Sequence, residues 1–126
     1  MKIQTSFFQR QKEVPFPVAI SRLVPPDFRG TLYRKLAPTR ELEEGLYKGR
    51  IDSELYVREY LKLLESRNLS PDIVVRELPF NCTLLCWERP YEFCHRHVVA
   101  RWILNATGIE VKEYGSRFIK PGLGIS

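Results

Sequence analysis

Residues 82–114 of the chain, CTLLCWERPYEFCHRHVVARWILNATGIEVKEY, decide the fold class. The opening seven residues form an apolar run without strict alternation, which is typical of a central strand covered on both faces. A helix with an apolar face is expected from about Cys94 to Thr107, with Gly108 as its C-cap and a last strand over 109–114. Because such a strand–helix–strand unit is a right-handed crossover, the stretch predicts an at least partly parallel sheet.

Upstream of this unit, apolar runs and helix-start signals predict two strands and three helices. Thr39, Asp52 and Ser70 are placed to cap the three helices. The expected strands are residues 2–8 and 16–21, and the expected helices are residues 40–47, 53–66 and 71–78. Segment 27–38 mixes aromatic and basic residues with Gly30 and is expected to be irregular, either a functional segment or a plain surface connection.

These elements predict one small α/β domain over residues 1–114. Its central sheet is expected to be mostly parallel and covered by the helices within 39–79, which makes a three-layer arrangement. The tail at 115–126 is rich in glycine and is expected to be loose. A length of 126 residues suits one such domain and buries enough surface to fold without a metal or disulfides.

The chain is moderately basic, with 20 lysines and arginines against 15 acidic residues and a pI near 9.3. This balance favours anionic partners such as nucleotides or nucleic acid, and it fits a plain soluble basic protein equally well. No stretch approaches the roughly 18 to 20 apolar residues of a membrane span, which excludes a transmembrane class and a membrane partner. Three cysteines without an apolar leader predict reduced thiols and a cytoplasmic setting.

The candidate site lies where the strand ending at Cys86 and Glu88 leads into the helix that begins at Cys94. Ligands of parallel sheets bind beyond the carboxyl ends of the strands, and a helix N-terminus attracts anions through its free N–H groups. His95 and Arg96 lie in the first turn of that helix, and the guanidinium of Arg96 suits a phosphate. The arrangement therefore predicts a phosphate-binding pocket.

The same residues permit thiol chemistry. At a helix N-terminus Cys94 would be stabilised as a thiolate, with His95 or His97 as base and Cys86 as a possible resolving thiol. Glu88 could orient a histidine or act as a general base. The structural alternative is that Cys86 and Cys94 are small core residues and that Glu88 pairs with Arg96.

A zinc site is a weaker alternative. Cys82 and Cys86 on one strand would lie about 13 Å apart, too far for one tetrahedral ion, whereas Cys86 with Cys94 and a histidine stays possible. Because the spacing matches no standard zinc signature, neither a metal nor a cofactor is assigned. Further along the same helix, His97, Arg101 and Asn105 are expected to form a solvated face.

Residues 84–97, LLCWERPYEFCHRH, resemble the hallmark of the bacterial and phage family called domain of unknown function 488. Its pattern of Cys-x-Glu followed by Cys-His-Arg is matched at Cys86, Glu88, Cys94, His95 and Arg96, and softer similarity extends to 20–22, 33–38 and 108–111. The resemblance implies a Rossmann-like α/β fold and a site at the Cys-His-Arg turn, without an activity. At 5–8 the chain has TSFF where many relatives carry a Gly-His-Ser-type turn, so no role of that histidine is carried over.

The leading hypothesis is a nucleotide- or nucleic-acid-directed domain that binds a phosphate at the helix beginning at Cys94. His95 and Arg96 would hold the phosphate, and Glu88 would be a general base or a hydroxyl binder. The remaining ligand-binding residues expected in the pocket are Arg22, Tyr33, Lys35 and Cys86. Hydrolase or transferase activity is left open, as is whether the chain is an enzyme. The alternatives are a thiol-dependent enzyme with Cys94 as nucleophile and, from family association alone, a non-catalytic binder in phage–host conflict.

Overall fold

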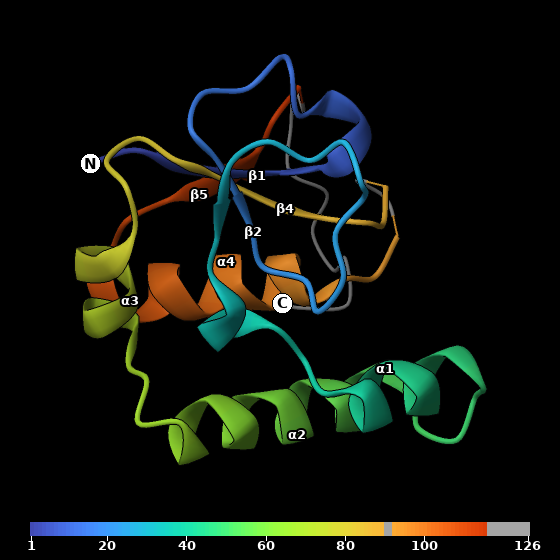
Figure 1. Cartoon of the computed structure of the whole chain (residues 1–126). Helices are drawn as coiled ribbons and strands as arrows, with labels where there is room; N and C mark the ends of the chain where they lie inside the picture. Colours follow the sequence, from blue (N-terminus) through green and yellow to red (C-terminus); the bar gives the residue numbers. More distant parts are fainter. Residues whose placement is uncertain (90–91, 116–126) are drawn as a thin grey trace.

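The computed structural model describes residues 1–89 and 92–115, and its centre is a five-stranded sheet (Figure 1). The strands are β1 (Ile3–Phe7), β2 (Pro17–Ala19), β3 (Thr31–Leu32), β4 (Thr83–Cys86) and β5 (Val111–Glu113). They lie in the order β3-β2-β4-β1-β5, and every pair is parallel. The predicted α/β fold with a mostly parallel central sheet is confirmed.

The helices begin and end close to the residues that the sequence predicted. They are α1 (Arg40–Tyr47), α2 (Ser53–Ser66), α3 (Pro71–Glu77) and α4 (His95–Thr107), with 3-10 turns η1 (Phe8–Arg10) and η2 (Arg34–Leu36). The side chains of Thr39, Asp52 and Ser70 each accept a backbone N–H in the first turn of the following helix. At its far end α4 is ended by Gly108, which adopts the left-handed φ of 77°.

The two faces of the sheet are covered in different ways (Figure 1). Val18 and Leu84 belong to the main core, where α4 packs directly on the sheet and α3 and α2 pack against α4. Ala19 and Leu85, which alternate with them, face a smaller cluster that includes Phe8 of η1. The domain thus has three layers and is Rossmann-like. The helices of 39–79 cover one face only, because the β2–β3 crossover contains no helix and lies with η1 over the other.

Segment 27–38 is less irregular than expected, because it contains β3 and η2. Gly30 lies directly before β3, where the chain passes very close to Pro17 at the start of β2. A Cβ atom at this position would lie 2.4 Å from the carbonyl oxygen of Pro17 and 2.8 Å from the ring of Phe28. Glycine is therefore required here because the backbones of the two segments nearly touch.

The outer face of α4 differs from expectation at one residue. Arg101 and Asn105 are exposed, whereas His97 is buried, so its assignment to a solvated face was wrong. Residues 94–99 are all buried, so the first turn of α4 has no solvated face. The tail at 115–126 was expected to be loose. Only Gly115 of this tail is described, and residues 116–126 lie outside the described residues.

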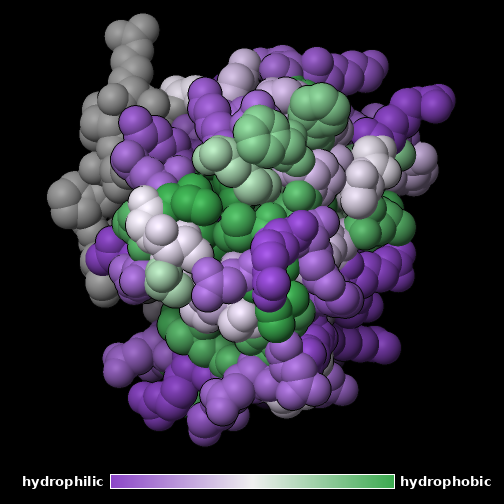
Figure 2. Space-filling view, turned by 90° about the vertical axis from the view of Figure 1, so that its left-hand side faces the viewer, coloured by the Kyte–Doolittle hydropathy of each residue, from purple (hydrophilic) through white to green (hydrophobic). Residues whose placement is uncertain are grey.

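The surface of the domain combines charged rims with apolar areas. Figure 2 shows apolar side chains gathered across the middle of one face, with hydrophilic side chains above and below them. Among the described residues, no helix combines the length and apolar character needed to cross a membrane. The exposed large apolar side chains include Phe16, Phe80 and Trp87.

Replacing Tyr60 by Phe tests how α2 is attached to η2. The buried hydroxyl of Tyr60 donates a hydrogen bond to the carbonyl oxygen of Leu36 at 2.6 Å, and both residues are fully buried. Tyr60→Phe leaves that carbonyl unsatisfied and should lower the free energy of unfolding by about 1–2 kcal/mol in denaturant titrations. Tyr47→Phe is the matched control, because Tyr47 is 90% exposed. Equal stability of the two variants would contradict the assignment.

Candidate functional site

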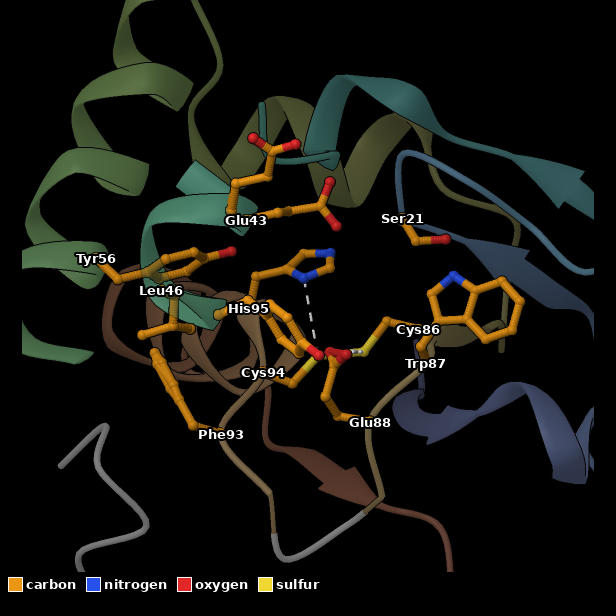
Figure 3. A pocket seen from close by; sticks show the side chains of 12 residues that line it. Ser21, Glu43, Leu46, Tyr56, Cys86, Trp87, Glu88, Phe93, Cys94 and His95 are labelled. Atoms are coloured by element: carbon orange, nitrogen blue, oxygen red, sulfur yellow. Dashed lines mark hydrogen bonds between the residues drawn. A yellow bond between two sulfur atoms is a disulfide. The ribbon is translucent and has the colours of Figure 1, made fainter. Parts of the chain in front are cut away.

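A cavity of about 390 Å³ lies at the carboxyl edge of the sheet, where β4 ends and α4 begins (Figure 3). Its walls are aromatic and acidic. The aromatic side chains are Tyr47, Tyr56, Trp87 and Phe93, and the carboxylates are Glu43, Glu44 and Glu88. Cys86, Cys94 and His95 complete the wall on the side of β4 and α4. The end of β4 and the start of α4 thus border one cavity, at the place where the sequence predicted a pocket.

The two cysteines of this cavity are bonded to each other. Cys86 is the last residue of β4, Cys94 is the N-cap of α4, and their sulfur atoms form a disulfide. Cys82 is buried and free. The expectation of three reduced thiols therefore differs from the structure. The sequence indicated that these two cysteines could meet, with Cys86 as a possible resolving thiol, but it did not indicate that they are joined in this structure.

His95 is held in one orientation by the backbone. Its Nε2 atom lies 2.7 Å from the carbonyl oxygen of Ile20, just beyond β2, and a carbonyl can only accept. Nε2 therefore carries the hydrogen, and the lone pair of Nδ1 faces Cys94 Sγ at 3.7 Å (Figure 3). Burial lowers the pKa of His95 to about 4. The imidazole is consequently neutral at physiological pH.

Arg96 is fully buried, and each nitrogen of its guanidinium group donates a hydrogen bond. Nε and Nη2 donate to the two carboxylate oxygens of Glu113 on β5 at 3.1 and 2.9 Å. Nη1 donates to the carbonyl oxygen of Glu88 at 2.6 Å and lies 2.8 Å from Cys86 Sγ. Arg96 thus places a positive charge directly behind the sulfur pair.

Glu88 turns its carboxylate toward the sulfur pair. Its Oε1 atom lies 3.7 Å from Cys86 Sγ. Burial raises the pKa of Glu88 above its ordinary value, although the charge of Arg96 acts in the opposite direction. The ligand atoms of Cys86, Glu88, Cys94 and His95 all lie within 4.8 Å of one another. Sulfur, nitrogen and carboxylate groups therefore converge on one point of the wall.

Five of the predicted site residues come together: Cys86, Glu88, Cys94, His95 and Arg96. The other three predicted ligand-binding residues do not line the cavity, and each binds a carboxylate. Tyr33 and Lys35 both donate to Glu77 on α3. Arg22 lies nearer, because its Nε donates to Glu43 of the cavity at 2.7 Å.

Sequence reasoning missed the contribution of α1 and α2 to the cavity. Glu43 and Glu44 come from α1, and Tyr56 comes from α2. Tyr56 also belongs to the main core, and burial raises the pKa of its phenol. Helical spacing of apolar residues can indicate the buried face of a helix, but it carries no information on which part of that face borders a cavity.

Comparison with known proteins supports the family resemblance. A family model described as the active DUF488-N3 subclade matches residues 9–107, a range that includes β2, β4 and α4. No curated protein and no solved structure matches the chain. The match covers all five residues that converge at the cavity.

Removing the carboxylate of Glu113 should be strongly destabilising. Glu113→Ala would leave the guanidinium of Arg96 buried without its counter-charge, a loss that typically costs about 3–5 kcal/mol. Chemical denaturation measures the loss directly. Glu54→Ala is the control, because the pair that Glu54 forms with Arg58 is largely exposed and should matter far less. Similar losses in the two variants would contradict the structural role of Arg96.

Protonation of His95 should make unfolding easier in mild acid. The pKa of His95 is about 4 in the folded chain and about 6.5 in the unfolded one, so the unfolded state binds the proton first as pH falls. The contribution of the neutral imidazole to the free energy of unfolding is nearly complete above about pH 6.5 and is lost as the pH falls toward 4. Between pH 7 and pH 5 the free energy of unfolding should fall by about 2 kcal/mol.

Unfolding of the oxidised protein at both pH values measures this loss. The variant His95→Asn removes the titrating group, so the difference in pH dependence between the two proteins isolates His95 from Glu88 and the other acids. The same pH dependence in both proteins would show that the imidazole is not held neutral by burial.

Proposed function

The chain belongs to the DUF488 family, and from this premise we propose that it is a thiol-dependent enzyme. Cys94 is the nucleophile and Cys86 the resolving thiol. The observation that carries the proposal is the meeting of the two sulfur atoms in the wall of the cavity, at the N-terminus of α4. The description of the matching subclade as active agrees with an enzyme.

Two sources of positive charge favour a thiolate in this pair. Cys94 is the N-cap of α4, where the helix dipole stabilises a negative sulfur. The guanidinium of Arg96 lies 2.8 Å from Cys86 Sγ and is itself anchored by Glu113. Both sources would stabilise a thiolate in the reduced pair.

His95 supplies an acceptor for the thiol proton of Cys94. Its Nδ1 lone pair faces Cys94 Sγ, and its Nε2 hydrogen is held by the carbonyl of Ile20. Because its pKa is only about 4, the imidazole passes the proton on rather than keeping it. Glu88, with a raised pKa and open to the cavity, is placed to receive or return a proton.

The reaction that these groups support is thiol–disulfide exchange with a small molecule. The Cys94 thiolate attacks one sulfur of a substrate disulfide, which forms a mixed disulfide and expels one thiolate. Cys86 then attacks Cys94 Sγ, which releases the second substrate thiol and forms the Cys86–Cys94 bond. Two electrons pass from the cysteine pair to the substrate, and two small thiols in a reducing cytoplasm reverse the change.

Nucleotide or nucleic-acid binding and a role in phage–host conflict stay predictions. The cavity charge is less suited to a phosphate than the sequence implied, because Glu43, Glu44 and Glu88 line it. Arg96, the expected phosphate ligand, is held by Glu113 and is fully buried. The aromatic walls suit an uncharged or cationic organic molecule better.

Alkylation of the reduced, EDTA-treated protein by iodoacetamide tests the proposal. Cys94 should react with a midpoint pH below the value of about 8.5 for a free thiol, as followed by residue-resolved mass spectrometry. Cys82→Ser is the matched control and should leave the midpoint unchanged, because Cys82 is buried and unbonded. A Cys94 midpoint at or above that of a free thiol would overturn the proposal.

A further inference from the structure

The groups around the sulfur pair also form a set of metal ligands. We infer that the reduced protein binds a divalent ion of the zinc class through Cys86 Sγ, Cys94 Sγ and His95 Nδ1, with the carboxylate of Glu88 as fourth ligand. These four ligand atoms lie within 4.8 Å of one another, and three of the four residues are buried. The inference concerns the same sulfur atoms as the proposed function, but it does not require their reactivity.

The backbone spacing of the two cysteines leaves room for an ion. Their Cα atoms are 7.7 Å apart, whereas the Cα atoms of disulfide-bonded cysteines usually lie about 4.4–6.8 Å apart. Tetrahedral zinc with Zn–S bonds of about 2.3 Å holds its two sulfur ligands about 3.8 Å apart. With the sulfur atoms at that separation, the ends of β4 and α4 suit two thiolates on one ion.

His95 already has the arrangement of a metal-binding histidine. Such histidines donate their second ring N–H to a backbone carbonyl or a carboxylate, which directs the other nitrogen at the metal. Nε2 of His95 donates to Ile20, and Nδ1 lies 3.7 Å from Cys94 Sγ. Tetrahedral zinc would place a nitrogen and a sulfur ligand about 3.5 Å apart, so little movement is needed. A neutral imidazole is also the form that binds metals.

The charges around the four ligands match a dication. Two thiolates and one carboxylate carry three negative charges, so the complex with a dication has one negative charge left. Arg96 places its guanidinium, which it shares with Glu113, in direct contact with Cys86 Sγ and so lowers the cost of this remaining charge. Its own partner Glu113 lies on the far side, on β5, and two hydrogen bonds keep the guanidinium in place. Arg96 is therefore a positioning residue that supports the thiolate ligands.

Metal binding and the disulfide exclude each other. Oxidation of the metal-bound pair by a small disulfide transfers two electrons to that disulfide, joins Cys86 to Cys94 and releases the ion. Two protons from solvent complete the two small thiols that leave. The state with the sulfur–sulfur bond is thus the metal-free form, and reduction creates the site.

Cobalt(II) added to the reduced full-length chain tests the inference. We expect saturation at about one equivalent, with a sulfur-to-cobalt charge-transfer band and the intense visible bands of a tetrahedral ion, both removed by added zinc. Cys82→Ser should behave like the wild type, because Cys82 is not a ligand. Glu88→Gln should bind more weakly, and Cys94→Ser should lose intensity in the charge-transfer band.

The disulfide form is the control for folding, because it keeps the wild-type sequence and should give no cobalt spectrum until it is reduced. A reduced wild type without a tetrahedral cobalt spectrum would overturn the inference, as would a Cys94→Ser variant with the spectrum of the wild type. Failure of the two proposals is distinguishable. If the alkylation midpoint of Cys94 in EDTA is lowered but cobalt does not bind, only the metal site is ruled out. If cobalt binds but the alkylation midpoint is that of a free thiol, only the thiol-dependent enzyme is ruled out.

Discussion

The buried ion pair of Arg96 and Glu113 holds the site together. It joins α4 to β5 by two hydrogen bonds, and Thr5 of β1 donates a further hydrogen bond to the same carboxylate. The remaining guanidinium nitrogen reaches the carbonyl of Glu88, just after the end of β4. Burying both charges is favourable only when all of these bonds form, because an uncompensated buried charge costs several kcal/mol. These hydrogen bonds therefore fix the position of the first turn of α4 relative to β4 and β5.

That placement explains why Cys94 and His95 border the cavity. Arg96 follows them directly in the chain, so fixing its guanidinium between β4 and β5 brings the preceding residues to the carboxyl edge of the sheet. In the structure the two sulfur atoms are bonded to each other. For the reduced form we propose two roles, a nucleophilic pair and a pair of metal ligands, and in both the guanidinium of Arg96 lies behind the sulfur atoms.

The sequence predicted the elements whose signals are local. Caps at Thr39, Asp52 and Ser70, the crossover at 82–114 and the convergence of Cys86 with Cys94 follow from spacing and from the rules of parallel sheets. Contacts between distant segments were not predictable in this way. Lys35 was expected at the pocket but pairs with Glu77, 42 positions away, and the burial of His97 depends on packing from several sides. The position of Tyr56 in the wall of the cavity is a contact between distant segments of the same kind.

The central claim is that one buried arginine, fixed by Glu113, supports a sulfur pair facing a cavity. A crystal structure of the reduced protein tests it most directly. The account predicts separated Cys86 and Cys94 sulfur atoms that still face each other across the cavity wall, with Glu88 and His95 beside them and Arg96 bidentate to Glu113. An Arg96 side chain released from Glu113 into solvent, or a Cys94 sulfur turned away from Cys86 into the core, would contradict it.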